Sequence, residues 1–163
     1  MTFAPRTWVV GEVVTAALLN QEVRDQFNSF FGAWTSYTPT WAGATTNPTL
    51  GNGTLTGRYM KVGRTVTAEI KLTTGSTSTY GSGIWRWSLP AAAASAHDAV
   101  GTAFVGDASA GYSIGVAYVS ASNTDVTVYV GSPTAGAAVS GSHPQTFAAG
   151  DRVWITVQYE AAS

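Results

Sequence analysis

The residues that could perform acid, base or metal chemistry are few and scattered along this chain. The 163 residues include two histidines, nine carboxylates and no cysteine. His97 and Asp98 are adjacent, and no second histidine or cysteine lies at a spacing typical of a metal site. A solvated loop explains this pair better than a metal site, so we predict no metal and no cofactor.

The carboxylates do not mark out a catalytic pair. Glycoside hydrolysis needs two acids that face each other across a groove. Asp107, Asp125 and Asp151 fall at predicted turns or strand ends, where aspartate commonly accepts backbone hydrogen bonds. The sequence contains neither a GxSxG nucleophile elbow nor a GxxxxGK[ST] phosphate loop. We therefore predict no catalytic residues and a protein that is not an enzyme.

Aromatic side chains are better candidates for a binding site. They make up 12% of the chain, and exposed tryptophan and tyrosine rings beside a polar or charged group are typical of saccharide binding. Tyr80 is one candidate. We predict ligand contacts from five further residues: Trp85, Arg86, Trp87, Tyr112 and Trp154. For the first two tryptophans of this set we favour the alternative, a place in the core or at a subunit interface.

The composition excludes several classes of partner. Charged residues amount to 10% and the formal net charge is -1, so the chain lacks the basic field that nucleic acid or an anionic membrane attracts. No apolar run is long enough to span a bilayer. The early segment WVVGEVV, broken by Gly11 and Glu12, does not resemble a signal peptide. We expect synthesis in a cytoplasm, no nucleic-acid partner and no membrane insertion.

Residues 15–34 have the period of an amphipathic helix. Thr15 is the predicted N-cap, and Gly32 is the predicted end. Large apolar residues recur at steps of four, four, three and four and share one stripe: Leu19, Val23, Phe27, Phe30 and Trp34. A helix of about 20 residues is roughly 30 Å long and marginal alone in water. The stripe must pack on the β domain or on copies of itself, and we predict that it forms an oligomer.

The remainder of the chain predicts roughly eight short strands without intervening helices. The clearest alternation runs over residues 65–72, with Val66, Ala68, Ile70 and Leu72 facing the core. Such a pattern is typical of an antiparallel sandwich, a jelly roll or a small barrel. We predict a mainly β protein, with a jelly-roll-like antiparallel β-sandwich head in residues 37–163. One N-terminal amphipathic α-helix, within residues 1–36, precedes the head.

Several segments resemble a family of phage proteins. The opening TWVVGEVVTAALLNQEVRDQF is similar to the N-terminal segment of tail-fibre and minor tail proteins of phages that infect Gram-positive hosts, particularly actinobacteria. In that family a TW–GE–VTAA–LN–VRD pattern precedes a β-rich head. Four later segments resemble its head modules: YTPTW, NPTLGNGTLTGRYMKVGRTVTAEIKL, IWRWSLP and FAAGDRVWITVQYEA. The resemblance covers residues 7–89 and 147–160, whereas residues 91–142 match no segment of the family.

The resemblance implies a homotrimer with jelly-roll-like heads, located in a virion tail or a phage-derived injection device. Its expected partners are other tail proteins and a saccharide of the host cell surface. Residues 1–36 would then contain a trimerisation helix, and the resemblance supplies no catalytic residue. We therefore expect a non-enzymatic tail-fibre or receptor-binding subunit.

Three alternatives stay open. A structural tail subunit would contact only virion proteins. A depolymerase would cleave the cell-wall polysaccharide, although the scarcity of acids argues against it. A free-standing carbohydrate-binding module would leave the helix unexplained.

Overall fold

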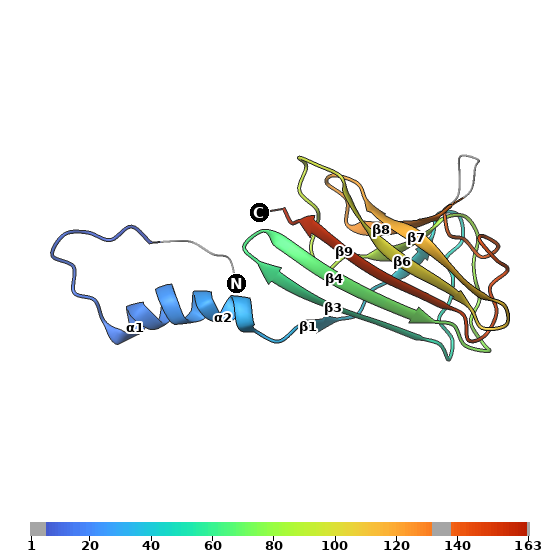
Figure 1. Ribbon diagram of the computed structural model, residues 1–163, viewed down its shortest axis with the longest axis horizontal. Helices are drawn as coiled ribbons and strands as arrows, with labels where there is room; N and C mark the ends of the chain where they lie inside the picture. Colours follow the sequence, from blue (N-terminus) through green and yellow to red (C-terminus); the bar gives the residue numbers. More distant parts are fainter. Residues whose placement is uncertain (1–5, 132–137, 163) are drawn as a thin grey trace.

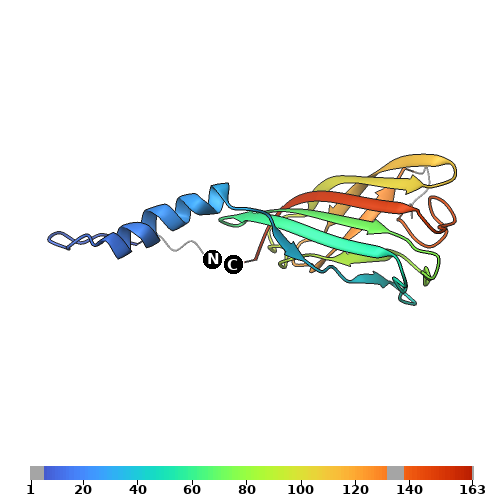
Figure 2. The same ribbon diagram turned by 90° about the horizontal axis from the view of Figure 1, so that it is seen from below.

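A computed structural model describes residues 6–131 and 138–162 of the chain. In this part, a helical segment is followed by nine strands that form one antiparallel sheet. The helical segment points away from the sheet (Figures 1 and 2). None of the described helices has the length and apolar character needed to cross a membrane.

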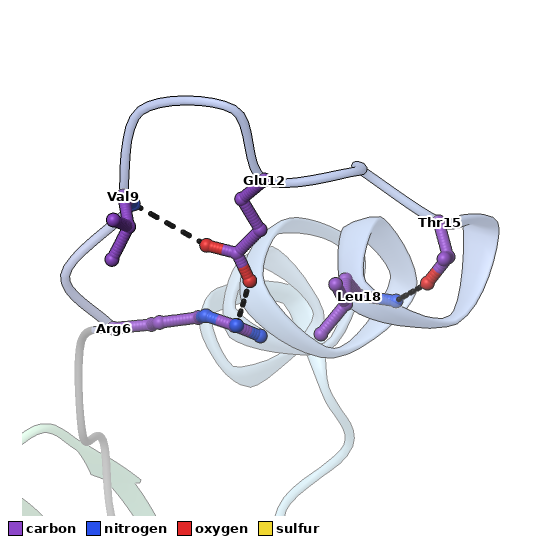
Figure 3. A network of polar contacts seen from close by, with 5 residues as sticks. All are labelled: Arg6, Val9, Glu12, Thr15 and Leu18. Atoms are coloured by element: carbon purple, nitrogen blue, oxygen red, sulfur yellow. Dashed lines mark hydrogen bonds and ion pairs between the residues drawn. The ribbon is translucent and has the colours of Figure 1, made fainter.

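The helical segment is continuous but changes its winding in the middle. It has three parts: α1 (Ala16–Leu19), the π-helical turn η1 (Asn20–Arg24) and α2 (Asp25–Phe31). The predicted ends are confirmed. The Thr15 hydroxyl accepts a hydrogen bond from the Leu18 amide at 3.3 Å (Figure 3). Gly32 is the C-cap.

The lead-in before the helix is held by one carboxylate. Glu12 accepts a hydrogen bond from the Val9 amide at 3.3 Å and pairs with the guanidinium group of Arg6 (Figure 3). These contacts curl the lead-in beside the start of α1, while its valine side chains stay exposed.

The π-helical turn affects the direction of the apolar stripe. In an α-helix, a step of four residues overshoots a full turn by about 40°, so a stripe built on steps of four drifts around the helix. Hydrogen bonds from i to i+5 widen the turn at η1 and take up part of this drift. Leu19, Val23, Phe27 and Phe30 are each 44% to 60% exposed. The stripe therefore faces solvent in the single chain.

The helical stripe is shorter than the sequence predicted. Because α2 ends at Phe31 and Gly32 has an extended ψ of 155°, Trp34 does not continue the helix. Its ring instead lies 4.8 Å from the guanidinium carbon of Arg58 on the sheet. Trp34 thus belongs to the joint between the helical segment and the head.

The strands in chain order are β1 (Thr35–Tyr37), β2 (Trp41–Gly43), β3 (Thr54–Val62), β4 (Thr65–Thr73), β5 (Trp85–Ser88), β6 (Ala99–Asp107), β7 (Gly111–Val119), β8 (Asp125–Val130) and β9 (Arg152–Glu160). All neighbouring strands are antiparallel. Their order across the sheet is β1-β3-β4-β9-β6-β7-β8-β5-β2. The predicted mainly β, antiparallel fold behind an N-terminal helix is confirmed.

The predicted two-sheet sandwich is wrong, because the described strands form one strongly curled sheet, a half-barrel (Figure 1). The last strand, β9, pairs with β4 on one side and β6 on the other. The hydrogen-bonded ladder therefore continues where a sandwich would divide into two sheets. Alternation in a sequence shows which face of a strand is buried, but it does not show the partner strand.

The inner face of the curled sheet encloses the core. The inward side chains of β4 are buried as predicted. Trp85 and Trp87 of β5 are fully enclosed, with 0% exposure. The Trp85 indole nitrogen donates to the Tyr80 carbonyl at 2.9 Å, and its ring lies 4.6 Å from that of Phe147. Neither tryptophan offers a ring face to a ligand, so their predicted ligand contacts are withdrawn.

The two edges of the sheet are joined by the short connection between β1 and β2. The Ser88 hydroxyl accepts from the Thr40 amide at 2.8 Å, and the Ser88 amide donates to the Thr40 carbonyl at 3.1 Å. The Tyr37 hydroxyl also donates to the Ser88 carbonyl at 3.3 Å. Because β1 and β2 are the opposite edges, this connection spans the open side of the half-barrel.

Candidate functional site

The outer face of the sheet carries three large aromatic side chains at one end. In the strand register, Trp154 of β9 pairs with Phe104 of β6. Tyr112 of β7 pairs with Gly106, two residues after Phe104. The rings therefore occupy adjacent outward positions on three neighbouring strands. We call Phe104, Tyr112 and Trp154 the aromatic platform.

The rings of the aromatic platform contact one another in sequence. The centroid of Phe104 lies 5.3 Å from that of Tyr112 and 5.4 Å from that of Trp154. The interplanar angles are 24° and 32°, so Tyr112 is stacked on the Phe104 ring and Trp154 is tilted against it. Tyr112 is 70% exposed and Trp154 is 38% exposed, whereas Phe104 between them is half-buried. The outcome is a stacked aromatic cluster whose outer members, Tyr112 and Trp154, are accessible to solvent.

The position of the central ring depends on a glycine. A Cβ atom at Gly106 would lie 2.7 Å from the Cε1 atom of Phe104. The Phe104 ring lies over the backbone of Gly106, in the space that a side chain would occupy. Gly106 therefore allows the ring to lie flat between its two neighbours.

Two cations lie beside the tryptophan of the aromatic platform. The Lys71 ammonium is 5.3 Å from the Trp154 ring centroid, and the Arg152 guanidinium carbon is 5.9 Å from it, within the range of cation–π attraction. Within residues 6–131 and 138–162, neither cation pairs with a carboxylate. The acid of β4, Glu69, is paired with Arg58 at 2.7 Å. The cations thus leave uncompensated positive charge on this side.

A shallow depression of about 250 Å³ adjoins the rings, where β6 turns into β7. Its lining includes Phe104, Tyr112, Arg152 and Asp107. The Asp107 carboxylate accepts from the Ser109 hydroxyl at 2.6 Å and from the Ser109 amide at 2.7 Å. These hydrogen bonds lower the pKa of Asp107, so this side chain is ionised at neutral pH.

The structure brings together two of the residues predicted to bind a ligand, Tyr112 and Trp154. Arg86 also faces outward, but β8 lies between its strand and β7. Tyr80 is half-buried and stacks on the core ring of Trp85 at 6.2 Å. These other candidates therefore lie apart from the aromatic platform.

Sequence reasoning missed three residues of this surface: Lys71, Phe104 and Arg152. Each has an alternation signal, because Lys71 and Phe104 lie between buried positions of their strands and Arg152 begins the alternation of β9. However, the signal only states that the side chain points outward. Their proximity depends on the pairing of β4, β9 and β6, which the local sequence does not contain.

The only histidine–carboxylate neighbour pair of the sequence lies elsewhere. His97 is exposed, and Asp98 accepts hydrogen bonds from the Tyr118 hydroxyl at 2.6 Å and the Ala121 amide at 2.8 Å. The Tyr118 hydrogen bond, aided by that from Ala121, lowers the pKa of Asp98. The described residues contain no cluster of three or more potential metal ligands.

A second exposed apolar surface lies on the helical segment. Leu19, Val23, Phe27 and Phe30 follow one another along it, and exposed valines of the lead-in extend the apolar surface. Contiguous apolar exposure of this kind marks interaction sites in soluble proteins. The molecule thus has an apolar surface on the helix and an aromatic, cationic surface on the sheet.

The fold places the chain in the mainly β class, as an antiparallel half-barrel with a projecting helix. Comparisons with models of known protein families, with curated proteins and with solved structures gave no match. The two exposed surfaces are therefore the structural basis for any functional proposal.

Proposed function

We propose that this protein is a tail-fibre or receptor-binding subunit of a phage or phage-derived tail device. It acts without turnover and attaches the tail to a host cell-surface saccharide as a homotrimer. The observation that carries the proposal is the apolar stripe of the helical segment, which the head leaves uncovered. The sequence resemblance to tail proteins supplies the setting and the number of copies.

The energetics of the stripe favour association. A helix of this length is marginal alone in water. In the single chain this helix also leaves Leu19, Val23, Phe27 and Phe30 half-exposed. Full burial of such a side chain contributes about 1.5–3 kcal/mol. Four half-exposed side chains per copy therefore favour a bundle by several kcal/mol. The two phenylalanines are bulky for a tight dimer seam, which suits a wider bundle.

The placement of the two surfaces also suits an attachment protein. The turn between β3 and β4 lies beside the helical segment (Figure 1). Tyr112 and Arg152 lie at the other end of the sheet, because Arg152 pairs with Thr73 at the far end of β4. A bundle of helices would therefore gather the heads at one end and leave the aromatic platforms free at the other.

The test is the mass of the protein in solution, measured by light scattering at micromolar concentration. We expect about three times the chain mass of 16.9 kDa. Val23→Asp and Phe27→Asp should each yield monomers, because a charge on the stripe opposes its burial. Asn28→Asp is the matched control, since it adds the same charge to the same helix away from the stripe, and it should remain trimeric. A monomeric unmodified protein would contradict the proposal.

A structural tail subunit is the second candidate. The observation that favours it is a row of exposed aliphatic side chains on the outer face, Val100, Ile114 and Val116, because such residues suit contact with protein. Retention of the labelled protein on actinobacterial cells separates the two candidates. The receptor-binding subunit should be retained on cells of its host, whereas the structural subunit should bind only other tail proteins.

A further inference from the structure

We propose that the aromatic platform, together with Lys71 and Arg152, binds an anionic saccharide polymer. This inference rests on the proposed receptor-binding function and names the ligand class and its site. The face of a sugar ring would lie on the aromatic rings. A carboxylate or phosphate group of the polymer would lie against the two cations.

The rings have the arrangement that a sugar face requires. Phe104 packs between the other two rings, with centroids 5.3 and 5.4 Å apart, so a sugar ring can lie against the sides of Tyr112 and Trp154 that Phe104 does not cover. Aromatic side chains combine a large apolar face with little conformational entropy to lose. The outermost ring, Tyr112, is 70% exposed, so a ligand can reach it without any rearrangement of the head.

The charges select the kind of saccharide. Lys71 and Arg152 both lie within 6 Å of the Trp154 ring centroid and have no carboxylate partner in the described part of the chain. Charge-assisted hydrogen bonds to a carboxylate or phosphate are stronger than neutral ones, and arginine can form them in pairs. A neutral saccharide would leave both cations unused.

The position of the acid gives the ligand a direction. Asp107 is the last residue of β6, before the β6–β7 turn, and it lines the depression together with Tyr112 and Arg152. The cations lie on the Trp154 side. An anionic group is therefore attracted toward Trp154, whereas sugar hydroxyl groups can donate to the carboxylate near Tyr112.

A second copy of the chain is the less favoured occupant. Association through the aromatic platform would bring two uncompensated cations into an interface, and burying unpaired charge is costly. The exposed aliphatic residues Val100 and Val116 lie on rows of the sheet closer to the helix. They offer a copy of the chain an apolar contact without that cost.

The experiment measures binding of the full-length protein to three polymers by isothermal titration calorimetry. Polygalacturonic acid supplies carboxylates on sugar rings, a phosphomannan supplies phosphates on sugar rings, and dextran is a neutral control. We expect binding to one or both anionic polymers, weakened by salt, and much weaker binding to dextran. Comparison of the two anionic polymers identifies the preferred group.

The variants are Trp154→Ala and the pair Lys71→Gln with Arg152→Gln. Each should weaken binding to the preferred anionic polymer by on the order of 10-fold or more. The matched control is Lys61→Gln, which removes one positive charge from an exposed side chain of β3 away from the aromatic platform, and it should leave the affinity unchanged. Circular dichroism and urea unfolding should show that all variants keep the fold, because the altered side chains are exposed.

Several outcomes would overturn the proposal. These are absence of binding to both anionic polymers, equal binding to dextran, or an equal loss in Lys61→Gln. A drop in molecular mass on Trp154→Ala would show that the surface joins copies of the chain instead. A trimer that is retained on host cells, with unaffected platform variants, would reject this site and keep the proposed function. A monomeric protein that still binds an anionic polymer through these residues would reject the proposed trimeric function and keep this site.

Discussion

At the scale of single residues, the tryptophans take very different roles. Trp85 and Trp87 are fully enclosed in the core, whereas Trp154 lies on the outer face beside two cations. Alternation alone places the first two on one side of their strand and the third opposite Val153 and Ile155. The burial of the three side chains confirms these orientations. It leaves no exposed ring of Trp85 or Trp87 for the predicted ligand contacts.

The difference in burial predicts a difference in stability. Trp85→Ala should lower the free energy of unfolding by about 3–5 kcal/mol, because it leaves a large cavity and removes the hydrogen bond to the Tyr80 carbonyl. Trp154→Ala should cost less, on the order of 1–2 kcal/mol, because it loses the contact with Phe104 but leaves no enclosed cavity. Urea unfolding followed by circular dichroism measures both. Equal losses in the two variants would refute the assignment of Trp85 to the core.

At the scale of elements, the strands decide the architecture through their pairing. The two edge strands, β1 and β2, have three residues each, and short edges offer little template for pairing with other chains. Ser88 of β5 bonds to the connection between them through its side chain and its backbone. These two bonds extend the β2–β5 ladder by one residue, and the Tyr37 hydroxyl, which donates to the Ser88 carbonyl, links the other edge strand to it.

Loss of this side-chain contact should be measurable. Ser88→Ala removes the acceptor of the Thr40 amide and should lower the free energy of unfolding by about 1 kcal/mol. Ser36→Ala is the matched control, because Ser36 lies on β1 and its side chain has no hydrogen bond within the described residues. Urea midpoints of the two variants give the comparison. An unchanged midpoint in Ser88→Ala would show that the connection does not stabilise the curled sheet.

At the scale of the whole molecule, the helical segment and the head are structurally separate. The described core contains no residue before Tyr37. The contact between Trp34 and Arg58 at the joint is an exposed cation–π interaction worth about 0.5–1 kcal/mol. Folding of the head therefore does not require the helix, whereas assembly, as we propose it, does.

This separation predicts that residues 35–163 fold on their own. The truncated protein should retain the β-type circular dichroism and a cooperative urea transition, and light scattering should show a monomer. The comparison is made at low protein concentration, because association stabilises the full-length chain by mass action. A truncated protein without a cooperative transition would show that the head depends on the helix.

Local periodicity predicted much of the fold. The helix, its two caps and its apolar stripe depend on residues three or four apart, and the inward and outward sides of β4 and β9 depend on residues two apart. The π-helical turn could not be read from this pattern, and it changes the direction of the stripe. The end of the helix at Phe31, which excludes Trp34 from the stripe, was also decided by local geometry after Gly32.

By itself, the sequence determined that the chain is a mainly β protein behind an amphipathic helix, because those features arise from neighbours along the chain. Only the tertiary structure decided that the strands form one curled sheet, and that Phe104, Tyr112 and Trp154 meet on its outer face beside Lys71 and Arg152. The physical reason is that pairing between distant strands depends on their register across the sheet. A shift of one residue in the register of β9 would turn the Trp154 side chain into the core, and its contacts with the aromatic platform would be lost.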